Sequence, residues 1–182
     1  MSSVCANEDL AALVRTIPDY PKPGILFRDV STLMLDGEAF RATIDRMAES
    51  VADQNFDLIA GIEARGFVFA SALAYKLGLG KVMLRKRGKL PGACVGVDYD
   101  LEYGTDRIEM HEDACGHGNH VLLVDDLLAT GGTALAAARL LRGSGAEVSM
   151  AAFVIDLPDL GGTERLVAEG ITPRTLVVFP GH

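Results

Sequence analysis

The sequence predicts an α/β fold in which a central, mainly parallel β-sheet is flanked by helices. Short β-rich runs alternate along the chain with helical patterns, and strands connected through helices run parallel with right-handed crossovers. The 182 residues are 49% hydrophobic, which is enough for one substantial core. Because no internal repeat or low-complexity stretch interrupts them, we expect a single domain that spans residues 1–182.

Residues 1–35 are predicted to form a short helix followed by an arm. Leu10, Leu13, Val14 and Ile17 recur at helical spacing, and this helix is expected to end near Pro18. The next segment, residues 18–35, contains three prolines and a glycine, which predicts an ordered loop or arm.

Helices and strands are predicted to alternate through the core, residues 36–182. Helical periodicity predicts helices over residues 38–53, 66–77, 132–142 and 162–169. Gly78 and Gly143 are the expected stop signals of the second and third. β-rich runs predict strands over residues 56–62, 81–85, 107–111, 121–125, 147–155 and 176–179, and residues 85–103 are expected to be irregular. Ligands of such sheets bind beyond the carboxyl ends of the strands, so the loops there are the candidate site.

Charge and composition limit the expected partners. The chain has 25 acidic and 17 basic residues, a net charge of -8, whereas nucleic-acid binding relies on basic side chains that neutralise phosphates. We therefore expect no nucleic acid as partner. The N-terminus has no secretory pattern, and no apolar run is long enough to span a membrane. The odd, widely spread cysteines Cys5, Cys94 and Cys115 fit reduced thiols and predict a cytoplasmic location.

The run VLLVDDLLATGGT, residues 121–133, carries the strongest chemical signal. A buried strand ends in Asp125 and Asp126, and a turn of small residues then opens a helix. Backbone N–H groups at a helix N-terminus bind phosphate, because they point at the ligand and the helix dipole favours negative charge. The residues that would present them are Ala129, Thr130, Gly131, Gly132 and Thr133. The alternative is a tight turn with capping threonines and solvated aspartates.

This run resembles the phosphoribosyl pyrophosphate signature of the type I phosphoribosyltransferases, in a form close to that of the adenine phosphoribosyltransferases. The resemblance implies the fold of that family, with an N-terminal hood arm and a mobile lid loop. It also implies that Asp125 and Asp126 face the ribose 2′ and 3′ hydroxyls, and that residues 129–133 hold the 5′-phosphate. Hypoxanthine-guanine enzymes usually have an aspartate where Ala129 stands, so the proton-handling group is expected elsewhere.

The segment YDLEYGTD, residues 99–106, is similar to the mobile lid of the adenine family. The resemblance implies that Glu102 is the catalytic acid or base, which exchanges a proton or hydrogen bond with N7 of adenine while N9 attacks C1′. Tyr103 would help to seal the site against water. Without the resemblance, a lone glutamate would be interpreted as a surface carboxylate.

The arm PGILFRDVS, residues 23–31, matches the base-binding hood of the same family. The resemblance implies that Phe27 stacks on the purine, and that the backbone of Leu26 and Arg28 reads its edge. A carbonyl accepts from the 6-amino group and an N–H donates to N1, whereas a 6-oxopurine presents the opposite pattern and is rejected. Phe27 could otherwise be an ordinary core aromatic.

Two further segments, GIEARGF (residues 61–67) and RKRGKLPG (residues 85–92), match the pyrophosphate-binding regions of the family. The implied contacts are Glu63, Ala64, Arg65, Arg85, Arg87 and Lys89. A solvated charged face is the alternative for the basic run. In the family this run lies at a dimer interface, which implies a homodimer.

The departing pyrophosphate implies Mg²⁺ held mainly by substrate oxygens and water, so no protein metal ligands are assigned. Cys115, His117 and His120 lack a convincing fourth ligand for zinc.

The implied function is transfer of the phosphoribosyl group to adenine, giving AMP and pyrophosphate. Two alternatives stay open. One is a phosphoribosyltransferase for another purine such as xanthine, although PGILFRD and LEYG favour adenine. The other is a non-catalytic regulator that senses the sugar phosphate, although such proteins usually add a DNA-binding domain.

Overall fold

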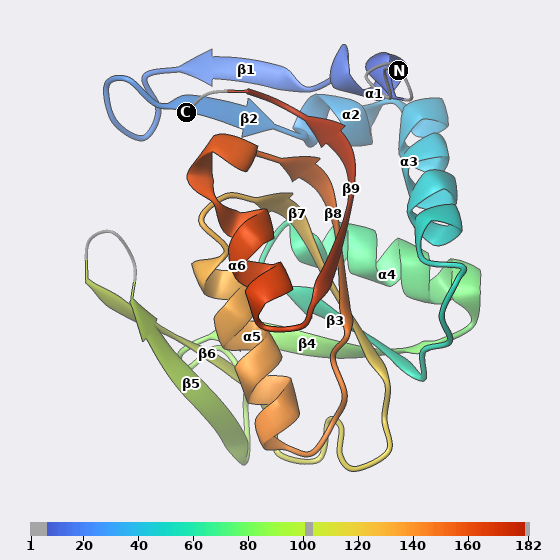
Figure 1. Ribbon diagram of the computed structural model, residues 1–182, viewed down its shortest axis with the longest axis vertical. Coiled ribbons are helices and arrows are strands. Elements are labelled where there is room, and N and C mark those ends of the chain that lie inside the picture. The colour runs from blue at the N-terminus through green and yellow to red at the C-terminus, as the bar shows by residue number, and fades with distance from the viewer. Residues whose placement is uncertain (1–6, 101–103, 181–182) are drawn as a thin grey trace.

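A seven-stranded β-sheet lies at the centre of the molecule (Figure 1). The computed structural model describes residues 7–100 and 104–180. In order across the sheet, the strands are β5 (Cys94–Asp100), β6 (Thr105–His111), β4 (Gly80–Lys86), β3 (Leu58–Ile62), β7 (Val121–Leu128), β8 (Met150–Asp156) and β9 (Thr172–Val178). The five strands from β4 to β9 pair in parallel, and β6 pairs antiparallel with both β4 and β5.

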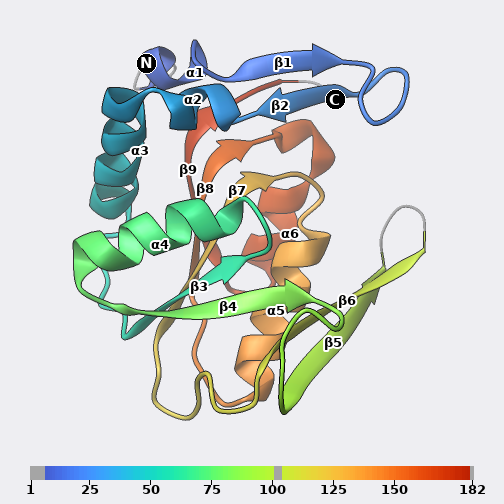
Figure 2. The same cartoon turned by 180° about the vertical axis from the view of Figure 1, so that it is seen from behind.

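Helices cover both faces of the sheet, so its inner strands are apolar on both sides (Figures 1 and 2). The helices α3 (Gly37–Ser50) and α4 (Gly66–Leu77) pack on one face, and α5 (Gly132–Gly143) and α6 (Gly162–Ala168) pack on the other. Strand β7 shows the alternation, because Leu122 and Val124 join the core under α3 and α4, while Val121 and Leu123 join the core under α5. A 3₁₀ turn, η1 (Pro158–Leu160), follows β8.

A small antiparallel hairpin lies beyond the carboxyl ends of β7 and β8 (Figures 1 and 2). It consists of β1 (Arg15–Pro18) and β2 (Leu26–Asp29), between the short helices α1 (Glu8–Ala11) and α2 (Ser31–Leu35). The Arg28 guanidinium lies 4.4 Å from the centre of the Phe179 ring, which ties the hairpin to the end of the chain. The β1–β2 hairpin therefore covers the carboxyl ends of these strands, where ligands are expected.

The predicted N-terminal helix reaching Pro18 is wrong, because helix α1 ends at Ala11 and residues 15–18 form strand β1. Four apolar residues at helical spacing were a weak signal. The pairing of β1 with β2, and the ion pair between Arg15 and Asp29, decide the conformation instead.

The other differences lie at the sheet edges and at helix ends. Residues 94–100, expected to be irregular, form β5, because the whole strand pairs with β6. Strand β9 starts at Thr172, four residues before the predicted strand, since an edge position tolerates Pro173. Gly143 does not stop α5 but forms its last residue, whereas Gly78 ends α4 in the left-handed region as predicted, at φ 69°.

No helix in the described part of the chain is long and apolar enough to cross a bilayer.

Replacing Asp29 by Asn is expected to destabilise the hairpin in a pH-dependent way. Hydrogen bonds from Ser31, and then the Arg15 guanidinium, lower the pKa of Asp29 from 3.8 to about 2. A folded pKa below the unfolded value stabilises the protein above the unfolded pKa, and this stability is lost as the pH falls toward the folded pKa. We expect the variant to unfold about 2–4 °C lower at pH 7, a cost of about 1 kcal/mol.

The measurement is thermal unfolding of both proteins at pH 7 and pH 3. The difference between them should shrink at pH 3, which lies below the unfolded pKa of 3.8, because the unfolded chain binds a proton there while the folded carboxylate does not yet. An equal difference at both pH values would contradict the electrostatic explanation.

Candidate active site

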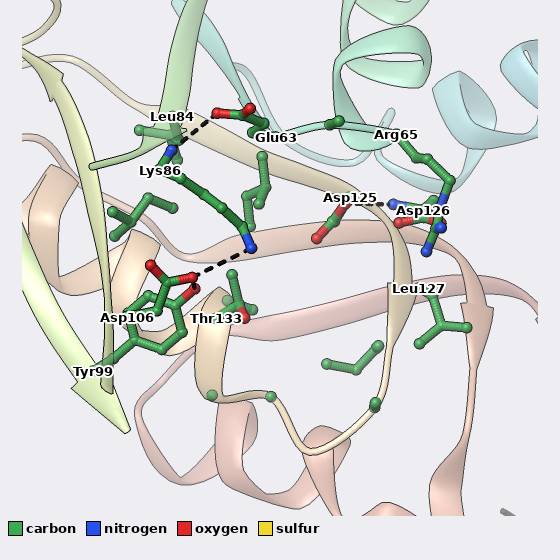
Figure 3. Close-up of a pocket in the computed structure, with 18 of the residues that line it drawn as sticks. Glu63, Arg65, Leu84, Lys86, Tyr99, Asp106, Asp125, Asp126, Leu127 and Thr133 are labelled. Atoms are coloured by element: carbon green, nitrogen blue, oxygen red, sulfur yellow. Dashed lines mark hydrogen bonds and ion pairs between the residues drawn. The ribbon is translucent and has the colours of Figure 1, made fainter. Parts of the chain in front are cut away.

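A pocket of about 510 Å³ opens at the carboxyl ends of β3, β4 and β7 (Figure 3). Its walls are residues 62–65, 84–86 and 125–134, together with Tyr99, Asp106 and Ile108 from the β5–β6 hairpin. The structure thus brings together three segments that were predicted separately from the sequence. They are residues 61–65, which we call the GIEAR loop, the start of the basic run (residues 85–92), and residues 129–133, which we call the phosphate loop.

The phosphate loop, residues 129–133, turns from β7 into the N-terminus of α5 as predicted. Gly131 precedes the helix with φ 77°, a conformation that a residue with a side chain rarely adopts. The first turn of α5 carries no acidic residue. The helix therefore directs free N–H groups and an uncompensated dipole at the pocket, which suits an anion.

Asp125 and Asp126 lie at the floor of the pocket, between the phosphate loop and Arg65 (Figure 3). The Arg65 Nε donates to Asp126 Oδ2 over 2.5 Å, and Asp126 is buried. Removal from water, together with the neighbouring Asp126, raises the pKa of Asp125 well above its ordinary value. The start of α4 packs directly against Asp125. Gly66 permits this close packing, because a Cβ on Gly66 would lie 2.6 Å from Asp125 Oδ1. The two carboxylates are thus held in a site that favours a cationic or hydrogen-bond-donating ligand.

The GIEAR loop contains a cis peptide between Glu63 and Ala64. Both residues line the pocket, but the Glu63 carboxylate is engaged with the end of β4. It accepts from Arg85 Nε at 3.2 Å and from the Lys86 backbone N–H at 2.9 Å. Glu63 therefore orients the basic run rather than facing the pocket as a free charge.

Only the part of the basic run that belongs to β4 lines the pocket. Arg85 lines the pocket, whereas Arg87 and Lys89 do not. The Arg87 side chain is 69% exposed and pairs with Asp98, and the Lys89 carbonyl accepts from Arg85. Lys86, which the sequence reasoning did not select, lines the pocket in their place. Pairing of Lys86 with Ile108 of β6 holds it beside the site, a contact that no local pattern reveals.

Lys86, Asp106 and Tyr99 form a polar cluster on the side of the pocket where the β5–β6 hairpin lies (Figure 3). The Lys86 Nζ is 3.3 Å from Asp106 Oδ2, and the Tyr99 hydroxyl donates to the same oxygen at 3.4 Å. Burial raises the pKa of Tyr99, and the Thr133 side chain of the phosphate loop acts in the opposite direction. This cluster, absent from the sequence predictions, connects the hairpin to the phosphate loop.

Asp106 adds a negative charge to the wall of the pocket beside Lys86, one of the pocket's cations. Partial burial would raise its pKa, but the Arg107 N–H and the Lys86 ammonium outweigh this effect and lower it. Replacing Asp106 by Asn is expected to lower the KM for a phosphorylated substrate about three- to fivefold, because one charge at a partly exposed site changes binding by about 1 kcal/mol.

The matched control for this prediction is Asp98→Asn, which removes the same charge from the same hairpin. Asp98 is 59% exposed, pairs with Arg87 and Arg107, and does not line the pocket. Steady-state kinetics of both variants give the comparison. Equal shifts in KM would mean that only the net charge of the hairpin matters.

The predicted base-binding residues, Leu26, Phe27 and Arg28, lie in β2 and do not line the pocket directly. Phe27 adjoins it, since the Arg65 guanidinium lies 5.1 Å from the centre of its ring. Tyr20, which sequence reasoning missed, packs edge-on against Phe27 at 5.2 Å. The Arg28 side chain turns to Thr16 and Phe179. Glu102 and Tyr103 lie outside the described residues.

Comparison with known proteins identifies the family. Residues 32–165 match the family model described as a phosphoribosyl transferase domain. An adenine phosphoribosyltransferase of a Chelativorans species is 58% identical over 176 residues, covering 97% of each chain. This chain belongs to the adenine phosphoribosyltransferase family.

Solved structures of the family agree with the fold. Adenine phosphoribosyltransferase from Thermoanaerobacter pseudethanolicus superposes with a TM-score of 0.91 at 44% identity, over 94% of this chain and 99% of that one. The enzyme from Giardia lamblia, complexed with 9-deazaadenine, superposes with a TM-score of 0.90 at 34% identity, over the whole of both chains. The predicted fold and the resemblance to adenine phosphoribosyltransferases are therefore confirmed.

Proposed function

We infer that this chain transfers the 5-phosphoribosyl group from phosphoribosyl pyrophosphate to N9 of adenine, giving AMP and pyrophosphate. The observation that carries the inference is the joining, in one 510 Å³ pocket, of an aspartate pair, a phosphate-binding helix start and three cations. The cations are Arg65, Arg85 and Lys86. The choice of adenine is supported by the names of the relatives and by the 9-deazaadenine bound to the Giardia lamblia enzyme.

The sugar half of the substrate is assigned to the β7 side of the pocket. Residues 129–133 bind the 5′-phosphate through backbone N–H groups and threonine hydroxyls. Asp125 and Asp126 accept hydrogen bonds from the 2′ and 3′ hydroxyls, and their charge favours an oxocarbenium-like ribose in the transition state. For this contact, Asp126 exchanges its bond with Arg65 for one with the sugar.

The leaving pyrophosphate is assigned to the part of the pocket made by residues 63–65 and the end of β4, where Arg65, Arg85 and Lys86 supply positive charge. Ala64 contributes backbone at the same wall. Within this subunit, Lys86 takes the role that was predicted for Arg87 and Lys89. Because neither residue lines the pocket of its own chain, we assign both to the partner subunit's site in a homodimer.

The homodimer proposal is supported by an apolar surface on α4 and β4. Val68 and Tyr75, seven positions apart on one face of α4, are 41% and 92% exposed, and Met83 of β4 is 43% exposed. Exposed apolar groups of this size favour an interface between proteins. Sedimentation should give twice the monomer mass, and Tyr75→Lys should shift it toward the monomer; a monomeric wild type would overturn this proposal.

Adenine is assigned to the space between the pocket and the β1–β2 hairpin. Phe27 stacks on the base, and the backbone of Leu26 and Arg28 pairs with its edge. Ala129 has no titratable group, so Glu102 serves as the acid or base at N7 and Tyr103 helps to close the site. A cytoplasmic location is the setting we propose, in keeping with the free thiols of Cys94 and Cys115.

Mg²⁺ is proposed to enter with the substrate. The described residues hold no group of three or more His, Cys, Asp or Glu side chains suited to a metal ion. The carboxylate oxygens of Asp125 and Asp126 give the pocket negative charge that suits a hard cation, so the pocket fits an ion that is held mainly by substrate oxygens and water. When bound, the ion supplies neutralisation of the pyrophosphate charge.

The test is incubation of the protein with phosphoribosyl pyrophosphate, Mg²⁺ and each purine in turn. Adenine should give AMP, and hypoxanthine, guanine and xanthine should give little product. Product from xanthine or hypoxanthine but none from adenine would overturn the assignment. Binding of the sugar phosphate without any product would instead favour a regulator.

A further inference from the structure

The first turn of α6 lies against the phosphate loop on the side of its carbonyl groups. The Arg165 Nη1 donates to the Thr130 carbonyl at 2.7 Å. Gly162 approaches the Ala129 carbonyl so closely that a Cβ on Gly162 would lie 2.2 Å from its oxygen. Two successive carbonyls of the loop are therefore held by α6.

The direction of these carbonyls fixes the direction of the next N–H groups. In a trans peptide the C=O and N–H bonds point in opposite directions. Both cis peptides of the described residues lie elsewhere, at Tyr20–Pro21 and Glu63–Ala64. The N–H groups of Thr130 and Gly131 therefore point away from α6, and both residues line the pocket. Among the described residues, neither N–H donates to a protein acceptor, so both are available to a ligand.

Helix α6 is itself anchored to the sheet. The Thr163 hydroxyl donates to Asp156 Oδ2 at 3.1 Å, and Asp156 is the buried last residue of β8. Leu166, one turn further on, is fully buried in the core under α5. The contacts of Gly162 and Arg165 with the loop thus belong to a rigid support rather than to a mobile surface segment.

We propose that Gly162 and Arg165 are positioning residues for the 5′-phosphate site. They hold the Ala129 and Thr130 carbonyls from behind, so that the Thr130 and Gly131 N–H groups face the phosphate before it binds. Such preorganisation strengthens binding because the loop does not need to be ordered when the ligand arrives. This inference rests on the proposed function, in which residues 129–133 bind the 5′-phosphate.

The first test is Arg165→Met, a surface substitution that should leave folding intact. We expect the KM for phosphoribosyl pyrophosphate and the Kd for AMP to rise about fivefold, the effect of one charge-assisted hydrogen bond at an exposed site. The KM for adenine and the Kd for adenosine, which lacks the phosphate, should not change. Arg165→Lys should restore most of the loss.

Arg139→Met is the control for charge. Arg139 lies on α5, pairs with Glu169 and is 63% exposed, so its loss removes the same charge without touching the loop. Equal effects of the two methionine variants on AMP binding would overturn the proposal, because net charge would then explain both.

Gly162→Ala tests the close approach and should raise the KM for phosphoribosyl pyrophosphate at least about tenfold, because the new Cβ displaces the Ala129 carbonyl. Gly143→Ala is its control, since a Cβ on this glycine of α5 meets nothing within 4 Å. Thermal unfolding of each variant shows whether the fold is kept. A lower Tm with unchanged AMP binding would contradict a positioning role.

Thr133→Ala separates failure of this inference from failure of the phosphate assignment. If Thr133→Ala weakens AMP binding while Arg165→Met and Gly162→Ala do not, the positioning role is wrong and the phosphate site stands. If none of the three variants weakens AMP binding, residues 129–133 are not the phosphate site and the inference falls with that assignment.

Discussion

Replacing Asp125 by Asn is expected to reduce kcat/KM by about 10²–10³-fold and, at the same time, to stabilise the free protein at pH 8. The loss of activity follows because the variant removes a charge that favours a cationic ribose in the transition state, and such electrostatic contributions have this size. The gain in stability follows because an amide has no charge to bury. Opposite effects on activity and stability are typical of residues that a site strains for function.

The sign of the stability change follows from the raised pKa of Asp125, which burial and then Asp126 cause. A carboxyl whose folded pKa exceeds its unfolded value binds more protons when folded. Its contribution to stability is therefore present at low pH and is lost as the pH rises through the folded pKa. Asparagine keeps an acceptor for the Asp126 N–H, which lies 2.9 Å from Asp125 Oδ1. We expect Tm to rise by about 2–4 °C at pH 8 and by less at low pH.

Thermal unfolding across pH, together with initial rates at saturating Mg²⁺, checks both parts. Asp45→Asn is the control, because Asp45 is 45% exposed and pairs with Lys76 on the protein surface. It should change neither quantity appreciably. Activity of Asp125→Asn within tenfold of the wild type would remove the ribose-binding role, and a lower Tm at pH 8 would refute the burial argument.

Replacing Glu102 by Gln is expected to lower kcat by about 10²–10⁴-fold, the usual contribution of a positioned acid or base. Ala129 cannot move a proton, and Asp125 and Asp126 are committed to the sugar in the proposed assignment. A glutamine keeps the size and a hydrogen bond but cannot exchange a proton with N7 of adenine. The loss should fall on kcat, with the KM for phosphoribosyl pyrophosphate little changed.

Glu112→Gln supplies the matched control for Glu102. Glu112 is an exposed carboxylate beyond the opposite end of the β5–β6 hairpin, where Cys94 pairs with His111. Measurement of kcat against pH for both variants and the wild type gives the comparison. Near-normal kcat in Glu102→Gln would exclude the acid or base role, although not the family.

The sequence by itself determined the family, the α/β fold and the segments that meet in the pocket. The thirteen residues from Val121 to Thr133 act locally, because a buried strand, two carboxylates and a glycine turn at a helix start suffice to make a phosphate loop. The periodicity of α3, α4 and α5 was equally local, and these helices lie within a few residues of the predicted bounds.

Only the tertiary structure decided which residues support and complete the site. Residues 15–18 form a strand because β2 pairs with them, and Lys86 rather than Arg87 faces the pocket because β6 pairs with the end of β4. Arg165 lies 35 positions from Thr130 in the chain, yet it holds the loop. Contacts between distant segments depend on strand pairing and packing, which leave no local periodicity or motif in the sequence.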